Sequence, residues 1–556
     1  MVIKYNFTFL AGSSLLAISN CSSNSSNHES LTPAKFSFPS PNVIIILLDD
    51  VGFNKLGAYS GNNLTPNIDA LAADGVVYDS VYVSSAVCTP SRYSLFTGNF
   101  AGRCTHERFL RENPVDQPYR INWNTYLTEN DNTLFETMRE NGYHTGFVGK
   151  WHLTHPNDLS KILPDFDLNL IPDSAESFLI RHQEILAEYI KKISGADIVE
   201  NVIAENNENN PLKELQCHHT EWMTLGLCNF IDESPDNKPF FAFLGTPLTH
   251  GPSALMSLKK NPVYTPEGRI NEVMKYHPDR QSVLNRFKNK VSEWDEGKLG
   301  AIWLDDQVGA VVKKLKEKGA YDNTIIIIVS DNNNEPGKAG CYESGTHVPM
   351  IIKWQNNKSK GTHSGQAIQT IDIFPTVIEE CGIELKDRKV DGISFAKNKK
   401  PDRKDLYFEM GITRALKYGK YKYIAFKMPE NEIEKMKTGK ISEAPNQMNV
   451  WWAAQTYVAM KAYPAYWDQD QLYDIVNDPF ELHNLASDTA YSKVLIEMKS
   501  RLAIYLGSFI HPYSLDFQEF MVSDEFNILK KEAQKKIPEM VNKLEMFNFK
   551  WPPVKK

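Results

Sequence analysis

Four short segments of this chain are largely apolar and are followed within a few residues by polar side chains. They are residues 43–48, 145–148, 240–244 and 324–329. A strand that is apolar on both of its faces is buried on both faces, which is typical of a parallel sheet covered by helices. The pattern therefore predicts four buried strands of a mainly parallel sheet.

Helical patterns lie between these strands. Residues 67–75 form a short amphipathic pattern that ends at a glycine, residues 133–141 begin with the capping residue Thr133, and residues 298–318 precede the last strand. Alternating strands and helices predict an α/β fold with a large, mainly parallel sheet flanked by helices. Ligands of such sheets bind beyond the carboxyl ends of the strands, where all four polar clusters fall.

The pattern changes after about residue 400. Residues 405–409 and 414–426 are typical of antiparallel strands, and residues 492–509 form an amphipathic helical pattern. We predict a smaller C-terminal α+β subdomain with an antiparallel sheet. Residues 153–238 are polar and irregular, and we interpret them as an insertion that is either a solvated surface excursion or a recognition lid.

The N-terminus is typical of an exported protein. Lys4 precedes an apolar run at 7–18 that is too short to span a membrane, and Cys21 follows with a Ser- and Asn-rich stretch. A cysteine in this place resembles a bacterial lipoprotein signal; the alternative is an ordinary signal peptide with Cys21 in a flexible tail. We expect a periplasmic or cell-surface protein, held as an outer-membrane lipoprotein and touching the membrane only through its lipid anchor.

These patterns together predict the organisation of the whole chain. The predicted parts are a signal peptide at 1–20, a lipoprotein tether at 21–38, a large α/β domain at 39–400 that contains the insertion, the C-terminal subdomain at 401–515, and a C-terminal helical tail at 516–556.

The balance of charge argues against a nucleic-acid partner. Lys and Arg number 61 against 69 Asp and Glu, a formal net charge of −8, so no overall basic field is present. An anionic substrate would need a local cluster of cations.

Two pairs of polar residues at strand ends predict a metal site. Asp49 and Asp50 follow the first apolar segment, and Asp331 and Asn332 follow the last. Carboxylate and amide oxygens are hard ligands that suit Ca²⁺ and, less well, Mg²⁺. Carboxylates crowded together need a cation, or they raise one another's pKa.

Cysteine spacing does not indicate a disulfide framework. The seven cysteines are an odd number, although Cys217 and Cys228 could pair in an exported protein. Cys88 stands out because Thr89 and Pro90 follow it at the start of a predicted helix, where the helix dipole favours an oxyanion. The alternative interpretation is a buried free cysteine.

The segment Cys88-Thr89-Pro90-Ser91-Arg92, with a Thr-Gly pair at 97–98, resembles the signature of type I sulfatases, in which the cysteine is oxidised to formylglycine (3-oxoalanine). Other segments resemble blocks of that family, in family order, over roughly residues 40–490. They are residues 42–50, 65–69, 149–152, 330–332, 337–338, 343–349 and 472–485. The resemblance implies an alkaline phosphatase-like fold and a sulfuric ester hydrolase. Its implied partner is a formylglycine-generating or anaerobic sulfatase-maturing enzyme.

The resemblance also implies roles for single residues. Asp49, Asp50, Asp331 and Asn332 would be calcium ligands, with Cys88 as formylglycine completing the shell.

The remaining implied roles concern the sulfate group and its protons. Arg92 would hold the hydrated formylglycine, and Lys150 and Lys338 would bind sulfate oxygens. His152 would be the base that releases sulfate, and His250 the acid that protonates the departing alcohol. Cations are needed because a sulfate ester is already anionic, and the near-neutral pKa of histidine suits both proton transfers.

The chain departs from the family pattern at three places. Thr249 stands where Pro is common, Asn333 where Gly is common, and His347 where Arg is common. We expect His347 on the substrate side of the site.

An exported sulfatase of this composition resembles polysaccharide sulfatases of Bacteroidetes. The predicted substrate is a sulfated oligo- or polysaccharide, either algal, such as ulvan or carrageenan, or a host glycosaminoglycan. One alternative is a phosphonate or phosphodiester hydrolase of the same superfamily. Another is a catalytically inactive, glycan-binding surface lipoprotein, which predicts an unmodified Cys88 and no calcium requirement.

Overall fold

The computed structural model describes residues 40–163, 176–334, 336–357, 360–385, 388–396, 403–427, 459 and 462–517, together with residues 531 and 535. The predicted signal peptide, Cys21 and the tether lie outside the described residues, as does most of the predicted tail at 516–556. In the described part of the chain, no helix is both long and apolar enough to cross a membrane.

The larger sheet has the spatial order β10-β2-β9-β8-β1-β5-β3-β4, with β11 beside β2. Its strands are β1 (Asn42–Leu48), β2 (Val76–Tyr82), β3 (His144–Lys150), β4 (Ile198–Ile203), β5 (Phe240–Gly245), β8 (Thr324–Ser330), β9 (His347–Lys353), β10 (Thr362–Ser364) and β11 (Ile368–Gln369). Strands β8, β1, β5, β3 and β4 are parallel, whereas β9 is antiparallel to both β8 and β2. The four segments singled out in the sequence are β8, β1, β5 and β3, which are neighbours, and the predicted fold class is confirmed.

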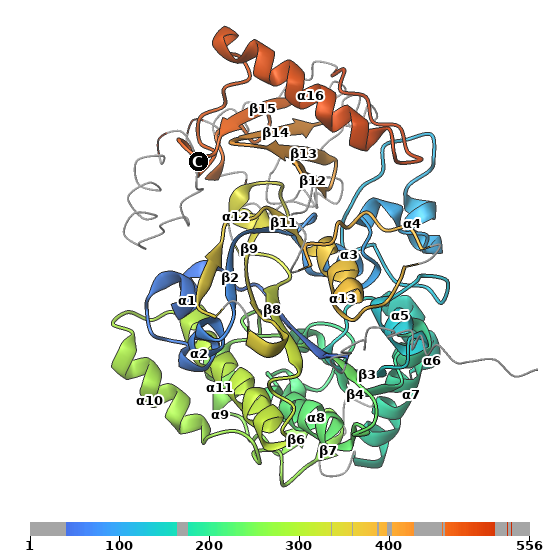
Figure 1. Ribbon diagram of the computed structural model, residues 1–556, viewed down its shortest axis with the longest axis vertical. Helices are drawn as coiled ribbons and strands as arrows, with labels where there is room; N and C mark the ends of the chain where they lie inside the picture. Colours follow the sequence, from blue (N-terminus) through green and yellow to red (C-terminus); the bar gives the residue numbers. More distant parts are fainter. Residues whose placement is uncertain are drawn as a thin grey trace, which may run out of the picture. The chain divides into compact units, whose positions relative to one another are not determined.

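Both faces of this sheet are buried, which explains its apolar strands. Along β1, Ile44 and Ile46 belong to one hydrophobic cluster, and Ile45 and Leu47 belong to another. Residues of α2, α8 and α11 pack in the first cluster, and residues of α3, α5 and α13 in the second (Figure 1).

The four helical patterns found in the sequence correspond to α2, α5, α11 and α16, each of which begins within two residues of its expected start. The helices of the described residues are α1 (Gly57–Ser60), α2 (Pro66–Ala73), α3 (Cys88–Thr97), α4 (Glu107–Glu112), α5 (Leu134–Glu140), α6 (Pro156–Ile162), α7 (Glu176–Ser194), α8 (Thr220–Glu233), α9 (Ala254–Lys259), α10 (Arg280–Lys290), α11 (Glu296–Glu317), α12 (Glu343–Thr346), α13 (Ile373–Glu380) and α16 (Ser492–Leu506). The Thr133 side chain caps α5 by accepting the N–H of Glu136. Helix α11 begins two residues earlier than expected because Asp295 caps it by accepting the N–H of Lys298.

Residues 153–238 are more regular than their composition indicated. They contain α6, α7 and α8, and β4 joins the larger sheet as a parallel partner of β3. Helix α8 packs against α11. The polar residues are explained by position, because β4 is a partly exposed edge strand and short 3₁₀ turns follow it at Asn207–Asn209 and Lys213–Leu215. The limits of this segment as an insertion stay a prediction.

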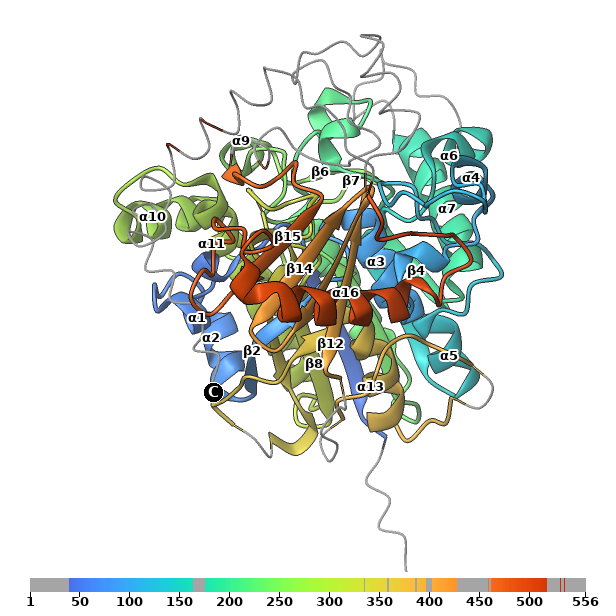
Figure 2. The same ribbon diagram turned by 90° about the horizontal axis from the view of Figure 1, so that it is seen from above.

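A separate antiparallel sheet follows, in the order β12-β13-β14-β15. Its strands are β12 (Asp405–Met410), β13 (Thr413–Tyr418), β14 (Tyr421–Phe426) and β15 (Asp470–Asp474), and α16 lies across it (Figure 2). A two-stranded hairpin of β6 (Tyr264–Thr265) and β7 (Gly268–Arg269) lies before α10.

A buried lysine ties the separate sheet to the larger one. Lys422 of β14 places its Nζ 2.9 Å from Glu343 of α12 and 3.4 Å from Glu481. The hydroxyl of Tyr82, in β2, donates to the same Glu343 carboxylate at 2.9 Å. Because an ionised group is costly to bury alone, these residues stabilise the junction only as a set.

Two adjacent histidines at the start of α8 make the stability of the fold sensitive to acid. Burial lowers the pKa of both His218 and His219 to about 4. The unfolded chain, where histidine has a pKa of about 6.5, therefore binds more protons at any pH below that value. We expect stability to be fully present above pH 6.5 and to fall toward pH 4, by about 3 kcal/mol per histidine at pH 4.

Urea unfolding between pH 7 and pH 5 measures this loss. His218 donates from Nε2 to the carbonyl of Pro252 at 2.8 Å, a hydrogen bond that glutamine can replace. The variant His218→Gln should lose less stability than the wild type over this range. Equal losses of stability in the wild type and His218→Gln would contradict the prediction that protonation of His218 destabilises the fold.

Candidate active site

The residues predicted to carry chemistry lie beyond the carboxyl ends of four neighbouring strands. Asp49 and Asp50 follow β1, Lys150 ends β3 with His152 two residues later, His250 follows β5, and Asp331 and Asn332 follow β8. Cys88 is the first residue of α3, and Lys338 lies between β8 and α12. The structure thus brings together side chains that are separated by up to 289 positions, from Asp49 to Lys338.

Asp49, Asp50, Cys88 and Asp331 form a buried cluster of potential metal ligands. One ligand atom from each lies within 4.8 Å of the others. Asn332 donates from Nδ2 to Asp50 Oδ1 at 2.6 Å, and its Oδ1 is buried with no hydrogen-bond partner among the described residues. Three carboxylates and a free amide oxygen are a hard donor set that fits a divalent cation such as Ca²⁺ or Mg²⁺.

Three cationic side chains surround these carboxylates. Lys150 Nζ contacts Asp49, and Lys338 Nζ lies 2.8 and 2.6 Å from the two carboxylate oxygens of Asp50. Arg92 Nη2 lies 3.1 Å from Asp331 Oδ2 and 3.6 Å from Asp49 Oδ2. Three carboxylates thus face three fixed cations. A divalent cation added to this set would leave a net positive charge, which suits an anionic substrate.

The carboxylates differ in their tendency to ionise. Burial by itself would raise the pKa of Asp49, but Lys150, His250 and Arg92 outweigh it and hold that pKa well below its usual range. Burial and the neighbouring Asp49 charge raise the pKa of Asp331 to about 7. A divalent cation would favour the ionised form of Asp331, so its ionisation and cation binding are linked.

Cys88 is poorly suited to act as a thiolate. Its Sγ lies 3.5 Å from Asp49 Oδ1, and burial together with the Asp49 charge raises the pKa of the thiol well above its usual value. A protonated thiol is a weak nucleophile.

Left-handed backbone conformations set the direction of two side chains at the strand ends. Asp50 and His152 have φ angles of 59° and 58°, which are uncommon for residues other than glycine and cluster at functional sites. On β3, three residues before His152, Gly149 has a φ of 95°. A Cβ at Gly149 would lie 2.2 Å from the carbonyl oxygen of Gly245. Glycine is therefore required where β3 and β5 approach most closely, next to Lys150.

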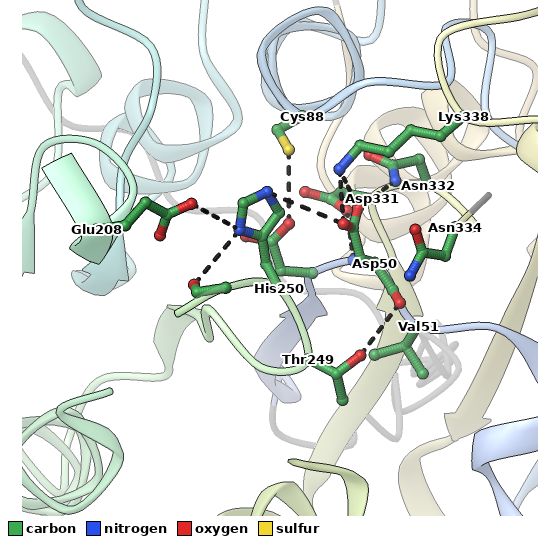
Figure 3. Close-up of polar contacts among 12 residues, drawn as sticks. Asp50, Val51, Cys88, Glu208, Thr249, His250, Asp331, Asn332, Asn334 and Lys338 are labelled. Carbon is green, nitrogen blue, oxygen red and sulfur yellow. Dashed lines mark hydrogen bonds and ion pairs between the residues drawn. The ribbon is translucent and has the colours of Figure 1, made fainter. Parts of the chain in front are cut away.

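The two predicted proton-transfer histidines have different surroundings. His152 is partly buried, and burial, followed by the charges of Lys150 and Arg92, lowers its pKa well below the usual value, so the ring is neutral. The side chain of His250 is 17% exposed, with Nε2 3.9 Å from Asp50 Oδ2 and Nδ1 3.4 Å from Glu208 Oε1 (Figure 3).

Two residues at the site were not identified from the sequence. Glu208 lies within residues 153–238, which were interpreted as either a solvated surface excursion or a recognition lid. Lys55 donates from Nζ to the carbonyl of Asp50 and to Thr249 Oγ1, both at 2.7 Å. The Glu- and Asn-rich composition around Glu208 gave no signal of function, and a lone lysine after β1 gave none either.

His347, expected on the substrate side, is instead enclosed by the protein. It is only 4% exposed, and its ring stacks on Tyr82 at 4.6 Å and meets Phe53 edge-on. Its Nε2 donates to the carbonyl of Asp79 at 2.9 Å, and burial lowers its pKa to about 3. The reason is its register, because His347 begins β9 directly opposite Tyr82 of β2.

The structure also shows whether Cys217 and Cys228 pair, which the sequence left open. Both residues are buried free thiols in the described part of the chain, as are Cys88, Cys104, Cys341 and Cys381.

Comparison with known proteins identifies relatives over most of the chain. A family model described as Sulfatase matches residues 41–383. N-acetylgalactosamine-6-sulfatase of Mus musculus is 25% identical over 407 residues, which are 69% of this chain and 71% of the relative. An uncharacterised sulfatase of Escherichia coli strain K12 is 23% identical over 507 residues, covering 85% of this chain and 88% of the relative.

Solved structures share the fold. A 6S-sulfatase from work on glycosaminoglycan metabolism by Bacteroides thetaiotaomicron has a TM-score of 0.55 at 22% identity, covering 84% of this chain and 99% of that one. A crystal structure of Ps i-CgsB in complex with k-i-k-neocarrahexaose has a TM-score of 0.53 at 19% identity, covering 91% of this chain and all of that one.

A cation that binds the carboxylate cluster should stabilise the folded protein. Binding at a concentration one hundredfold above the dissociation constant adds about 2.7 kcal/mol to the free energy of unfolding. We expect added CaCl₂ to raise the Tm, and Asp331→Ala to abolish that rise because it removes a ligand. Calorimetry with and without a chelator measures both effects.

The matched control is Asp236→Ala, since the Asp236 side chain is 98% exposed. This variant should keep the calcium-dependent rise in Tm. An unchanged rise in Asp331→Ala would show that calcium binds elsewhere.

Proposed function

Because the chain belongs to the sulfatase family, we propose that it hydrolyses sulfate esters of carbohydrates, using a formylglycine made from Cys88 and a bound Ca²⁺. The observation that carries this proposal is the convergence of Cys88 with Asp49, Asp50 and Asp331 in one buried cluster. The family generally uses formylglycine and a divalent metal. Calcium is favoured over magnesium because it accepts more oxygen ligands with less regular geometry.

Each charged side chain has a task in this chemistry. A cation held by Asp49, Asp50, Asp331 and Asn332 would supply positive charge for the sulfate oxygens. Lys150 and Lys338 add further positive charge on the same side of the site, which lowers the cost of bringing an anionic nucleophile to an anionic ester.

Arg92 fixes this arrangement rather than contacting solvent. It is fully buried, and besides Asp331 it donates from Nη1 to the carbonyl oxygen of Lys150 at 2.8 Å. Its guanidinium therefore fixes the end of β3 against the end of β8. In the proposed function it also holds the oxidised residue 88, which lies one helical turn away on α3.

Two histidines handle the protons. His250, which is partly exposed, donates a proton to the oxygen of the departing alcohol. His152 is neutral and so is able to accept a proton. After addition of one water molecule, the aldehyde of residue 88 would supply two hydroxyl groups. One would attack sulfur, and loss of the proton of the other would release sulfate and restore the aldehyde. An unmodified serine or cysteine would leave a stable sulfated side chain.

The proposed substrate is a sulfated carbohydrate, with an algal polysaccharide such as carrageenan or ulvan preferred over a glycosaminoglycan. Support comes from the relative named for N-acetylgalactosamine 6-sulfate and from the structural neighbour that holds a neocarrahexaose. We place the protein outside the cytoplasm, exported by its N-terminal segment and lipidated at Cys21. This location gives access to extracellular polysaccharides.

Replacement of Cys88 tests the proposed function. The protein is expressed with a formylglycine-generating enzyme, and sulfate release is measured from carrageenan and ulvan oligosaccharides, N-acetylgalactosamine 6-sulfate and 4-nitrophenyl sulfate. We expect Cys88→Ala to lower the rate on the order of 10³-fold or more, as for removal of other nucleophiles. Mass spectrometry of the peptide that contains residue 88 should show conversion of the thiol to an aldehyde in the wild type.

The control is Cys381→Ala, which removes another buried thiol, at the end of α13. It should remain active, and circular dichroism should show that both variants are folded. Substantial sulfate release by Cys88→Ala, or a clear preference of the wild type for phosphodiesters, would contradict the proposed function.

A further inference from the structure

Glu208 contacts His250 from outside the cluster of metal ligands and sulfate-binding lysines. Its Oε1 lies 3.4 Å from His250 Nδ1, while His250 Nε2 faces Asp50 Oδ2 at 3.9 Å. Figure 3 shows Glu208 and Asp50 on opposite sides of the imidazole ring. The Nδ1 atom also lies 3.4 Å from the carbonyl oxygen of Gly251, so both of its neighbours are hydrogen-bond acceptors.

We propose that Glu208 is a positioning residue for His250, which holds the ring so that Nε2 faces the leaving group of the substrate. This inference rests on the proposed function, in which His250 protonates the departing alcohol. Glu208 itself touches neither the ester bond nor the metal ligands in this arrangement, and it acts only through the histidine.

The chemistry of imidazole explains why such a partner matters. The ring has two different nitrogens, and a half-turn about its bond to Cβ moves each nitrogen to the place of a ring carbon, Nδ1 to that of Cδ2 and Nε2 to that of Cε1. The hydrogen bond made by one nitrogen determines which nitrogen carries the proton and which is free. In the acid role the ring carries a proton on both nitrogens. With acceptors on the Nδ1 side, Nδ1–H is fixed, and the Nε2 proton faces the leaving group of the substrate. The ring is then held in one orientation before the substrate arrives, which reduces the entropy lost on reaching the reactive geometry.

The backbone around Glu208 holds it in place. Trp151 and His152 donate their N–H groups to the carbonyls of Ile203 and Ala204, both at 2.9 Å, so the end of β4 lies beside the end of β3. The 3₁₀ turn Asn207–Asn209, which contains Glu208, follows four residues after β4. Asn207 is only 3% exposed, so the turn is anchored in the protein although the Glu208 side chain is 38% exposed.

The residues next to His250 fit the same arrangement. Gly251 permits the approach, because a Cβ there would lie 3.3 Å from Glu208 Oε1. On the other side, Lys55 links the hydroxyl of Thr249 to the carbonyl of Asp50, which fixes the backbone that carries His250. The backbone and the ring of His250 are therefore held by separate partners.

A pair of aryl sulfates that differ in leaving group tests this role. 4-Nitrophenol is a good leaving group without protonation, whereas phenol depends more on the acid. In Glu208→Ala we expect kcat for phenyl sulfate to fall on the order of 10-fold, as for outer partners that orient functional histidines. For 4-nitrophenyl sulfate, kcat should change less than about twofold, and KM should be unchanged for both substrates.

Two further variants separate positioning from other roles. Glu208→Gln retains an acceptor oxygen and should recover most of the lost rate with phenyl sulfate. In a His250→Ala background, Glu208→Ala should cause no additional loss, because a residue that acts through the histidine has nothing left to act on. Glu214→Ala, which removes an exposed carboxylate six residues later, is the control and should match the wild type.

Several results would overturn the inference. Equal loss with both substrates would indicate general disruption, and a full additional loss in the His250→Ala background would indicate direct contact with substrate. Failure of Glu208→Gln to exceed Glu208→Ala would also exclude positioning through an acceptor oxygen.

A crystal structure of Glu208→Ala gives a readout that does not depend on turnover. The His250 ring should be rotated or present in more than one orientation, and an unchanged ring with Nε2 still facing Asp50 would refute the proposal. Absence of wild-type turnover with every sulfate ester would contradict the proposed function instead, while the ring orientation would still decide the role of Glu208.

Discussion

The mutual repulsion of Asp49, Asp50 and Asp331 is the constraint on which the rest of the site depends. These carboxylates are buried together at the ends of β1 and β8, where water does not screen their charges. Lys150, Lys338 and Arg92 compensate for them, and each comes from a different part of the chain. The positions of β3, α3 and the segment before α12 are therefore coupled, because removal of any one cation would leave an unpaired buried charge.

Much of the fold could be predicted from the sequence because its central strands are buried on both faces. Strands β1, β3, β5 and β8 were found as apolar segments. Because the carboxyl ends of parallel strands lie at the same end of a sheet, the sequence correctly placed four polar residues together there, Asp49, Asp50, Asp331 and Asn332. The edge strand β4 was missed because only part of it is buried. Periodicity identifies strands but not their order, so the neighbouring placement of these four became known only from the structure.

The limits of prediction at the site have a similar physical origin. The side chain of His347 is enclosed because His347 pairs with Tyr82 of β2, which is 265 positions earlier in the chain. No local pattern encodes that pairing. Glu208 contacts His250, which lies 42 positions later in the chain, and Lys55 contacts Thr249, which lies 194 positions later. Residues that belong to a motif were predictable, whereas residues that support the motif from distant segments were not.

The junction made by Lys422 bears on how this chain could be divided. The matched family region ends at residue 383, but the charge of Glu343 within it is compensated by Lys422 in β14. Glu481, the other neighbour of Lys422, is itself an acid and supplies no positive charge. A fragment cut at residue 383 would remove Lys422 from Glu343, which lies only five residues from Lys338. The end of the matched family region therefore does not coincide with the end of this network of buried charges, and recombination of the C-terminal sheet between relatives must exchange both sides of the junction together.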